Sequence, residues 1–127
     1  MTRRVALLAV LLMTAEVGVF AQPDPRYRAW GREALDRVRG DMDRAERNLH
    51  YLPADEFKRF NQTRAEIGEF QHRWEEGRFD KGALDHIIGN LNHVVQYEKL
   101  RPHDRDVLAD DVQRLRELRE RWDHPHH

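Results

Sequence analysis

The chain has 127 residues, of which 35% are charged and 39% hydrophobic, and its formal net charge is -1. This length suits one domain with a modest core, and the even balance of charges offers no basic field for a nucleic acid. The sequence contains no cysteine and no serine, which excludes disulfides, zinc–thiolate sites and Ser or Cys nucleophiles. We therefore expect a non-enzymatic domain without catalytic or cofactor-binding residues and without a cofactor.

Residues 1–21 have the pattern of a secretory signal peptide. Arg3 and Arg4 precede an apolar run from Val5 to Ala15, which Glu16 ends. That run is shorter than the roughly 20 apolar residues of a membrane-spanning helix. With Ala21 at the last position, the pattern predicts cleavage before Gln22. We expect an exported protein, periplasmic or secreted, with no stable membrane span after cleavage; an uncleaved anchor and a buried first helix are the alternatives.

The first helix is expected to begin at Pro25, with Asp24 as its N-cap, because proline suits the first helical position. Tyr27 and Trp30 begin its apolar stripe. The stripe then follows alternating steps of three and four residues, which is typical of a helix that packs lengthwise against others. It consists of Leu35, Val38, Met42, Ala45, Leu49 and Leu52.

Three further segments carry the same helical period. The second starts near Pro53, ends near Gly77 and has Phe57, Phe60, Ile67, Phe70 and Trp74 on one face. The third follows Asp80 as its N-cap, with the most apolar stripe of the four, formed by Leu84, Ile87, Ile88, Leu91, Val94 and Val95. The fourth runs from about Pro102 to Trp122, with Leu108, Val112, Leu115, Leu118 and Trp122 inward.

These segments predict an all-α fold, because no useful stretch alternates apolar and polar residues as a strand does. The expected links, near Leu52-Pro53, Gly77-Asp80 and Leu100-Pro102, have about three to five residues and favour antiparallel neighbours. We expect an antiparallel up-down four-helix bundle over residues 22–122, followed by a polar, His-rich tail at 123–127. Self-association is an alternative, since the apolar third helix could serve a second chain.

Two segments suggest a duplicated helical hairpin. Residues 34–45 read ALDRVRGDMDRA and residues 83–94 read ALDHIIGNLNHV, and Pro53 and Pro102 share their offset of 49. Chance similarity between heptads rich in Leu and Asp is the other explanation. If duplication is correct, Gly40 and Gly89 occupy related places, and we expect close helix contact there because a mid-helix glycine costs about 1 kcal/mol relative to alanine.

Histidine is the most suggestive residue type, with eight copies. His86 and His93 lie two turns apart on the third segment, about 10 Å along the helix axis, so one ion cannot easily bridge them. A site would need one of them plus His72, Glu69 or Asp36 from another helix. The tail residues His124, His126 and His127 form a second candidate cluster for Cu, Ni or Zn. The alternative for every candidate is a solvated surface histidine.

Asp104, Asp106, Asp110 and Asp111 cluster near the expected start of the fourth helix. Acidic residues there complement the positive end of the helix dipole, and we interpret all four in this way rather than as a calcium loop.

The sequence as a whole favours an exported, non-enzymatic structural, interaction or chaperone-like protein that binds another protein or itself. The alternative is an extracytoplasmic metal-binding or metal-sensing module that uses the histidines. The expected architecture resembles that of small exported helical proteins that act as envelope-stress chaperones or metal sensors. The LTxxQ motifs of the best-known of these families are absent, so the resemblance assigns no residue a role.

Overall fold

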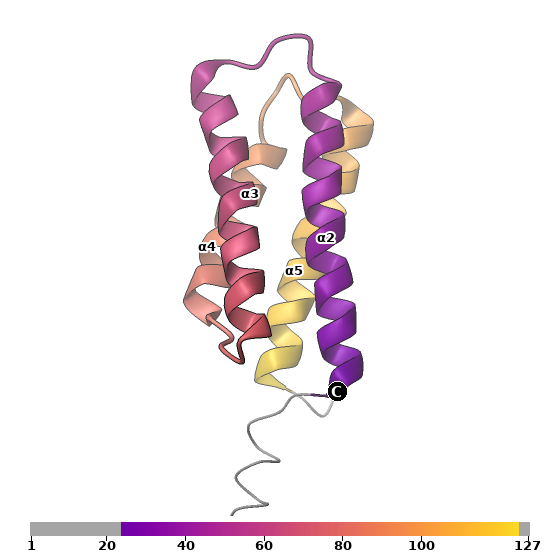
Figure 1. Cartoon of the computed structure of the whole chain (residues 1–127). Helices are drawn as coiled ribbons and strands as arrows, with labels where there is room; N and C mark the ends of the chain where they lie inside the picture. Colours follow the sequence, from indigo (N-terminus) through magenta and orange to yellow (C-terminus); the bar gives the residue numbers. More distant parts are fainter. Residues whose placement is uncertain (1–23, 125–127) are drawn as a thin grey trace, which may run out of the picture.

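A computed structural model describes residues 24–124 and contains four helices and no strand within that range (Figure 1). The helices are α2 (Pro25–Arg47), α3 (Ala54–Glu75), α4 (Lys81–Val95) and α5 (Pro102–Asp123). Consecutive helices run in opposite directions, and the contacts close a ring in which α2 and α4 each pack against α3 and α5. The all-α prediction is confirmed. The expected signal peptide, His126 and His127 lie outside the described residues.

Two helices begin at the aspartates that the sequence indicated. The Asp24 carboxylate accepts a hydrogen bond from the Arg26 N–H at 2.9 Å, and the Asp80 carboxylate accepts one from the Ala83 N–H at 3.0 Å. Such bonds satisfy amides that have no partner in the first helical turn. At the other end of α3, Gly77 has a φ of +93°, a conformation that glycine adopts without a Cβ clash. The predicted helix stop at Gly77 is confirmed.

The core lies between the four helices and is dominated by apolar residues. At the end of the bundle where α3 connects to α4, aromatic rings fill it: Trp74 lies 5.5 Å from Tyr27 and 5.4 Å from Phe79, centroid to centroid. Trp122 stacks on Phe79 at 4.2 Å, centroid to centroid, but stays 37% exposed. The prediction that Trp122 points inward is therefore only partly correct. The buried residues of α4 are all apolar, as expected: Leu84, Ile87, Ile88, Leu91 and Val94.

Two details of the expected stripes are wrong. Phe57 is 51% exposed, because the steps of three and four along α3 lead from Phe60 back to Glu56, which occupies the inner position instead. Leu49 and Leu52 pack against the core, but they do so from the connection 48–53, since α2 ends at Arg47. The Asn48 side chain there donates to Asp104 at the start of α5. The apolar stripe alone predicts a helix that continues through Leu49 and Leu52. Instead, the chain leaves the helix after Arg47 and turns towards α5.

Gly40 and Gly89 lie in similar surroundings, but these surroundings are open space rather than the expected contact between helices. Gly40 and Gly89 are both exposed, and a Cβ added at either would meet nothing within 4 Å. The close helix contact expected at these positions is therefore absent. Gly31 is the glycine at which two helices approach closely, because a Cβ there would collide with the Trp74 ring.

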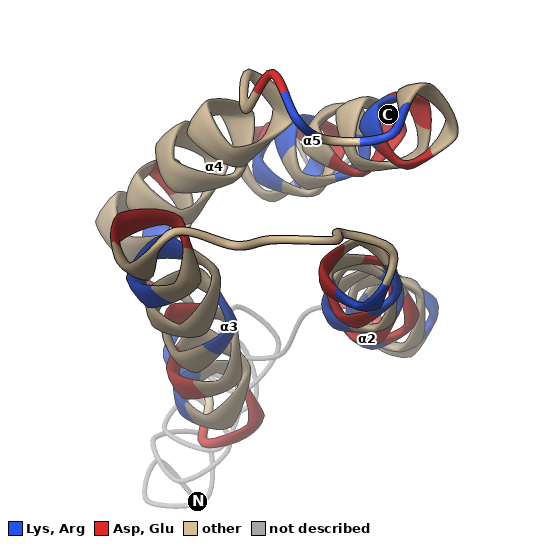
Figure 2. Ribbon diagram, turned by 90° about the horizontal axis from the view of Figure 1, so that it is seen from above, with Lys and Arg blue, Asp and Glu red and all other residues tan. Residues whose placement is uncertain are grey.

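Charged residues of both signs are frequent along α2, α3 and α5, while α4 contains few (Figure 2). Several ion pairs join neighbouring helices, such as Arg64 of α3 with Asp43 of α2 at 3.1 Å and Arg119 of α5 with Asp85 of α4. Among residues 24–124, none of the helices combines the length and the apolar character needed to span a membrane.

Candidate functional site

A groove of about 640 Å³ runs along the outer side of the contact between α2 and α5. Acidic and arginine side chains from both helices line it, together with one glycine and one valine. The lining residues are Glu33, Asp36, Arg37, Gly40, Asp41 and Arg44 from α2, and Val107, Asp110 and Arg114 from α5. The groove therefore offers both signs of charge on rigid helices, and we take it as the candidate site.

Two buried aspartates lie at this contact: Asp41 of α2, which lines the groove, and Asp111 of α5, which follows the lining residue Asp110. The Asp41 side chain is 10% exposed and that of Asp111 is 0% exposed. Both occupy inward positions of their helices: Asp41 lies between Val38 and Ala45, and Asp111 follows buried Leu108 by three residues. Side chains three or four residues apart share a helix face, so each aspartate points towards the facing helix rather than to solvent.

Each aspartate has an arginine three residues later on its own helix. Arg44 Nη1 lies 3.4 Å from Asp41 Oδ1, and Arg114 Nη1 donates to Asp111 Oδ1 at 3.1 Å. The second oxygen, Oδ2, of each aspartate is buried and has no hydrogen-bond partner. A buried acceptor without a donor is costly, and a proton on one of the two carboxyl groups would supply the missing donor.

Asp111 carries the most perturbed carboxyl group of the described residues. Burial raises its pKa to about 8, with a further rise from the hydrogen bond and negative charge of Asp41, while Arg114 opposes the shift. The proton that Asp111 holds near neutral pH turns the contact between two carboxyl groups into an O–H···O hydrogen bond. Perturbed carboxyl groups are candidates for function, but Asp111 does not line the groove and has no exposed surface with which to reach a substrate.

The charges around the groove are largely paired within each helix. Arg37 lies 3.7 Å from Glu33, and Asp36 accepts from Arg39 at 2.7 Å. Asp110 is exposed at the rim and has no hydrogen bond or ion pair with any described residue. The rim therefore keeps one acidic group available to a partner.

The buried aspartates correct our interpretation of the acidic cluster in α5. Asp106 and Asp110 are exposed, but Asp104 and Asp111 are buried in the bundle, and Asp104 accepts a hydrogen bond from Asn48 at 3.0 Å. The helix dipole alone does not account for them. Their spacing was the available signal, because Asp104, Leu108, Asp111, Leu115 and Leu118 follow the alternating steps of four and three that mark the inner face.

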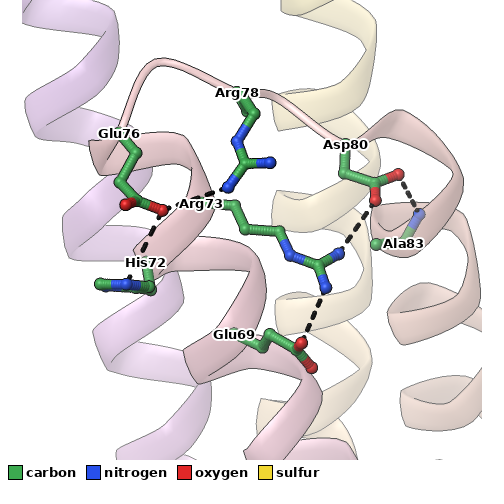
Figure 3. A network of polar contacts seen from close by, with 7 residues as sticks. All are labelled: Glu69, His72, Arg73, Glu76, Arg78, Asp80 and Ala83. Atoms are coloured by element: carbon green, nitrogen blue, oxygen red, sulfur yellow. Dashed lines mark hydrogen bonds and ion pairs between the residues drawn. The ribbon is translucent and has the colours of Figure 1, made fainter.

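The histidines that the sequence singled out lie on different parts of the surface. His72 lies 3.7 Å from Glu76 beside the turn between α3 and α4, where Arg73 bridges Glu69 and Asp80 (Figure 3). His93 is exposed on α4. His124 lies 3.5 Å from Glu120 near the end of α5. The structure does not bring these three histidines together.

His86 is the candidate with the closest carboxylate on another helix. Its Nε2 lies 3.2 Å from Glu66 Oε2 of α3, and the other oxygen of Glu66 accepts from Asn90 at 2.9 Å. Glu69 and Asp36, the carboxylates considered for a metal site, are paired with Arg73 and Arg39 instead. In the described part of the chain, no group of three or more His, Asp or Glu side chains is placed to hold a metal ion.

Comparisons with known proteins assign the chain to no family. No protein-family model matches it, and no curated protein and no solved structure is significantly similar to it.

Proposed function

We propose that the chain is an exported, non-enzymatic interaction protein, structural or chaperone-like, that binds a partner protein along the groove between α2 and α5. The observation that carries the proposal is the groove itself, which combines paired arginines, a free rim carboxylate at Asp110 and open space above Gly40. Mixed charges on rigid elements favour specific recognition of a charged partner segment.

The sequence and the structure both support the non-enzymatic part of the proposal, and the sequence supports export. The chain has no Ser or Cys to act as a nucleophile, and its most perturbed carboxyl group, Asp111, is buried out of reach of a substrate. The basic and apolar pattern of residues 3–15 supports export. The mature protein recovered outside the cytoplasm is then expected to begin at Gln22, which intact mass spectrometry measures.

Photocrosslinking at Gly40 tests the groove as a binding surface. We expect p-benzoylphenylalanine at position 40 to form a discrete adduct with one partner protein in cells that produce the chain. The same amino acid at Gly89 is a matched control, because Gly89 is also exposed and mid-helical, with open space around it, but does not line the groove.

The outcome depends on the comparison between the two positions. An adduct at position 40 that is absent at position 89 and weakened by Asp110→Asn supports binding in the groove. Equal adducts at both positions, or none at position 40 in a folded and correctly localised protein, contradict it. Far-UV circular dichroism of both variants establishes that each remains helical.

The second candidate function is an extracytoplasmic metal-binding or metal-sensing module. The contact between His86 of α4 and Glu66 of α3 favours it, because a histidine and a carboxylate from two helices already lie 3.2 Å apart. Zn, Cu and Ni accept such ligands, and the tail histidines are a separate candidate cluster.

A thermal melt with and without Zn, Cu and Ni tests this candidate. A metal at 100 times its dissociation constant adds about 2.7 kcal/mol to the free energy of unfolding, which raises the melting temperature by several degrees. If the pair of His86 and Glu66 is the site, we expect His86→Gln to abolish the rise in melting temperature. If the tail is the site, we expect substitution of His124 to abolish it. A melt that is indifferent to all three metals excludes the metal candidate.

A further inference from the structure

The α2–α5 interface differs from its two neighbours because no ion pair crosses it within residues 24–124. Arg64 joins α3 to Asp43 of α2, and Arg119 joins α5 to Asp85 of α4. Between α2 and α5, by contrast, each arginine of the groove pairs with a carboxylate of its own helix. Opposite charges therefore do not hold these two helices together.

Hydrogen bonds hold the two ends of this interface. At one end the Tyr27 hydroxyl donates to the Leu118 carbonyl oxygen at 2.6 Å, and at the other Asn48 donates to Asp104 at 3.0 Å. Burial raises the pKa of Tyr27, so its hydroxyl stays a donor in mildly alkaline solution. Between the two ends, Asp41 of α2 and Asp111 of α5 contact each other; both side chains are buried, and each has a buried Oδ2 atom without a hydrogen-bond partner.

The surroundings of this pair decide its charge. The charged residues that line the groove are Glu33, Asp36, Arg37 and Arg44 from α2, and Asp110 and Arg114 from α5. The buried residues of α4, the other helix packed against α5, are all apolar. Two ionised carboxylates in such a poorly solvated interface repel each other, whereas one proton between them makes a hydrogen bond. The contact is attractive in one protonation state and repulsive in the other.

We propose that the Asp41–Asp111 pair is a proton-operated latch, in which one bound proton keeps the middle of α2 packed against α5 and its loss separates the two helices beside the groove. The latch requires only the described geometry and holds whether or not the groove binds a partner. Since both ends of the interface keep their hydrogen bonds, opening is confined to the middle of the two helices.

The size of the effect follows from proton linkage. Once the pair is open and hydrated, Asp111 titrates near its ordinary value, far below its value in the closed latch. Between those two values, each pH unit increases the ratio of open to closed latch by up to about tenfold.

Hydrogen–deuterium exchange of the full protein between about pH 6 and pH 9 tests the proposal. After correction for the intrinsic exchange rate, we expect amides in the middle of α2 and α5 to lose protection by up to about tenfold per pH unit. Amides of α3 and α4 serve as the internal reference and are expected to follow the intrinsic rate alone. In Asp111→Asn the amide group donates to Asp41 at every pH, so this extra loss is expected to disappear.

The matched control is Asp110→Asn, which removes the same charge from the neighbouring exposed residue and is expected to leave the response intact. The latch is refuted if, in the wild type, the amides of α2 and α5 lose protection with rising pH no faster than those of α3 and α4. It is also refuted if Asp111→Asn shows the same pH-dependent loss as the wild type. If Asp111→Asn does not fold, carbon-13 NMR of the wild-type side chains decides: one aspartate titrating above about pH 7 supports the proposal, and none above about pH 5 refutes it.

Discussion

The residues on which the proposed latch depends are exceptions to the apolar core. Five polar side chains are buried among the described residues: Asp41, Thr63, Gln71, Asp104 and Asp111. Thr63 donates to the Arg59 carbonyl at 2.8 Å, Gln71 accepts from Arg39 at 2.8 Å, and Asp104 accepts from Asn48. Of these five residues, Asp41 and Asp111 each leave a buried carboxyl oxygen without a donor. Their cost in stability therefore depends on whether a proton is present.

Asp111→Asn is expected to stabilise the protein at neutral pH. The pKa of Asp111 is about 8 in the folded protein and near 3.8 when unfolded, so the folded state holds a proton that the unfolded state has lost. The free energy of unfolding thus falls as pH rises from about 4 to about 8, by about 1.4 kcal/mol per unit from this residue alone.

Urea unfolding at several pH values measures this slope. We expect the contribution of Asp111 to be complete below about pH 4, to decline through the interval up to its folded pKa, and to be absent from the profile of Asp111→Asn. Asp110→Asn is expected to keep the wild-type slope. A slope unchanged by Asp111→Asn would show that the buried pair is not protonated in the folded protein.

At the level of the helices, most boundaries follow local rules. The Asp24 and Asp80 caps, the prolines that begin α2 and α5, and the left-handed Gly77 after α3 were readable from the sequence. The glycines within the helices were not, because a mid-helix glycine indicates either close packing or open space. The structure assigns close packing to Gly31 and open space to Gly40 and Gly89.

Alanine substitutions at these glycines are expected to have opposite effects. Gly40→Ala and Gly89→Ala should each raise the free energy of unfolding by about 1 kcal/mol, because alanine favours the helix and the new methyl group meets nothing. Gly31→Ala should lower it, because its Cβ would collide with Trp74. Thermal melts of the three variants compare them directly, and a stabilising Gly31→Ala would contradict the packing described here.

At the level of the whole molecule, the two related hairpins are not equivalent in their packing. Trp74 near the end of α3 and Trp122 near the end of α5 occupy matching places in the possible repeat if its offset of 49 slips by one residue. Trp74 is 5% exposed inside the aromatic cluster, while Trp122 is 37% exposed and has one face stacked on Phe79. Whatever its origin, the similarity of sequence does not extend to equal burial.

This difference in burial predicts that replacing the two tryptophans by alanine lowers the free energy of unfolding by unequal amounts. Trp74→Ala is expected to cost about 3–5 kcal/mol, the range for a large aromatic residue removed from a core. Trp122→Ala should cost clearly less, because much of its ring is already in water. Chemical denaturation of the two variants gives both values, and equal losses would indicate that Trp122 is buried in solution, for instance by self-association.

The sequence by itself determined the all-α class, the positions of the four helices and most of their inner faces. These features depend on residues close together in the chain: caps, prolines, glycine stops and steps of three and four residues. It also contained the spacing that places Asp104 and Asp111 on an inner face, but the same acidic residues fit the helix dipole, so the spacing alone did not decide between the two explanations.

The tertiary structure alone decided which helices meet and at what level. The pairing of Asp41 with Asp111, the groove beside it and the separation of the histidines all depend on contacts between residues far apart in the chain. A periodic pattern defines one face of a helix but not its partner. Because burial and the neighbouring carboxyl group together set the pKa of Asp111, its charge at neutral pH is a property of the assembled bundle rather than of any one helix.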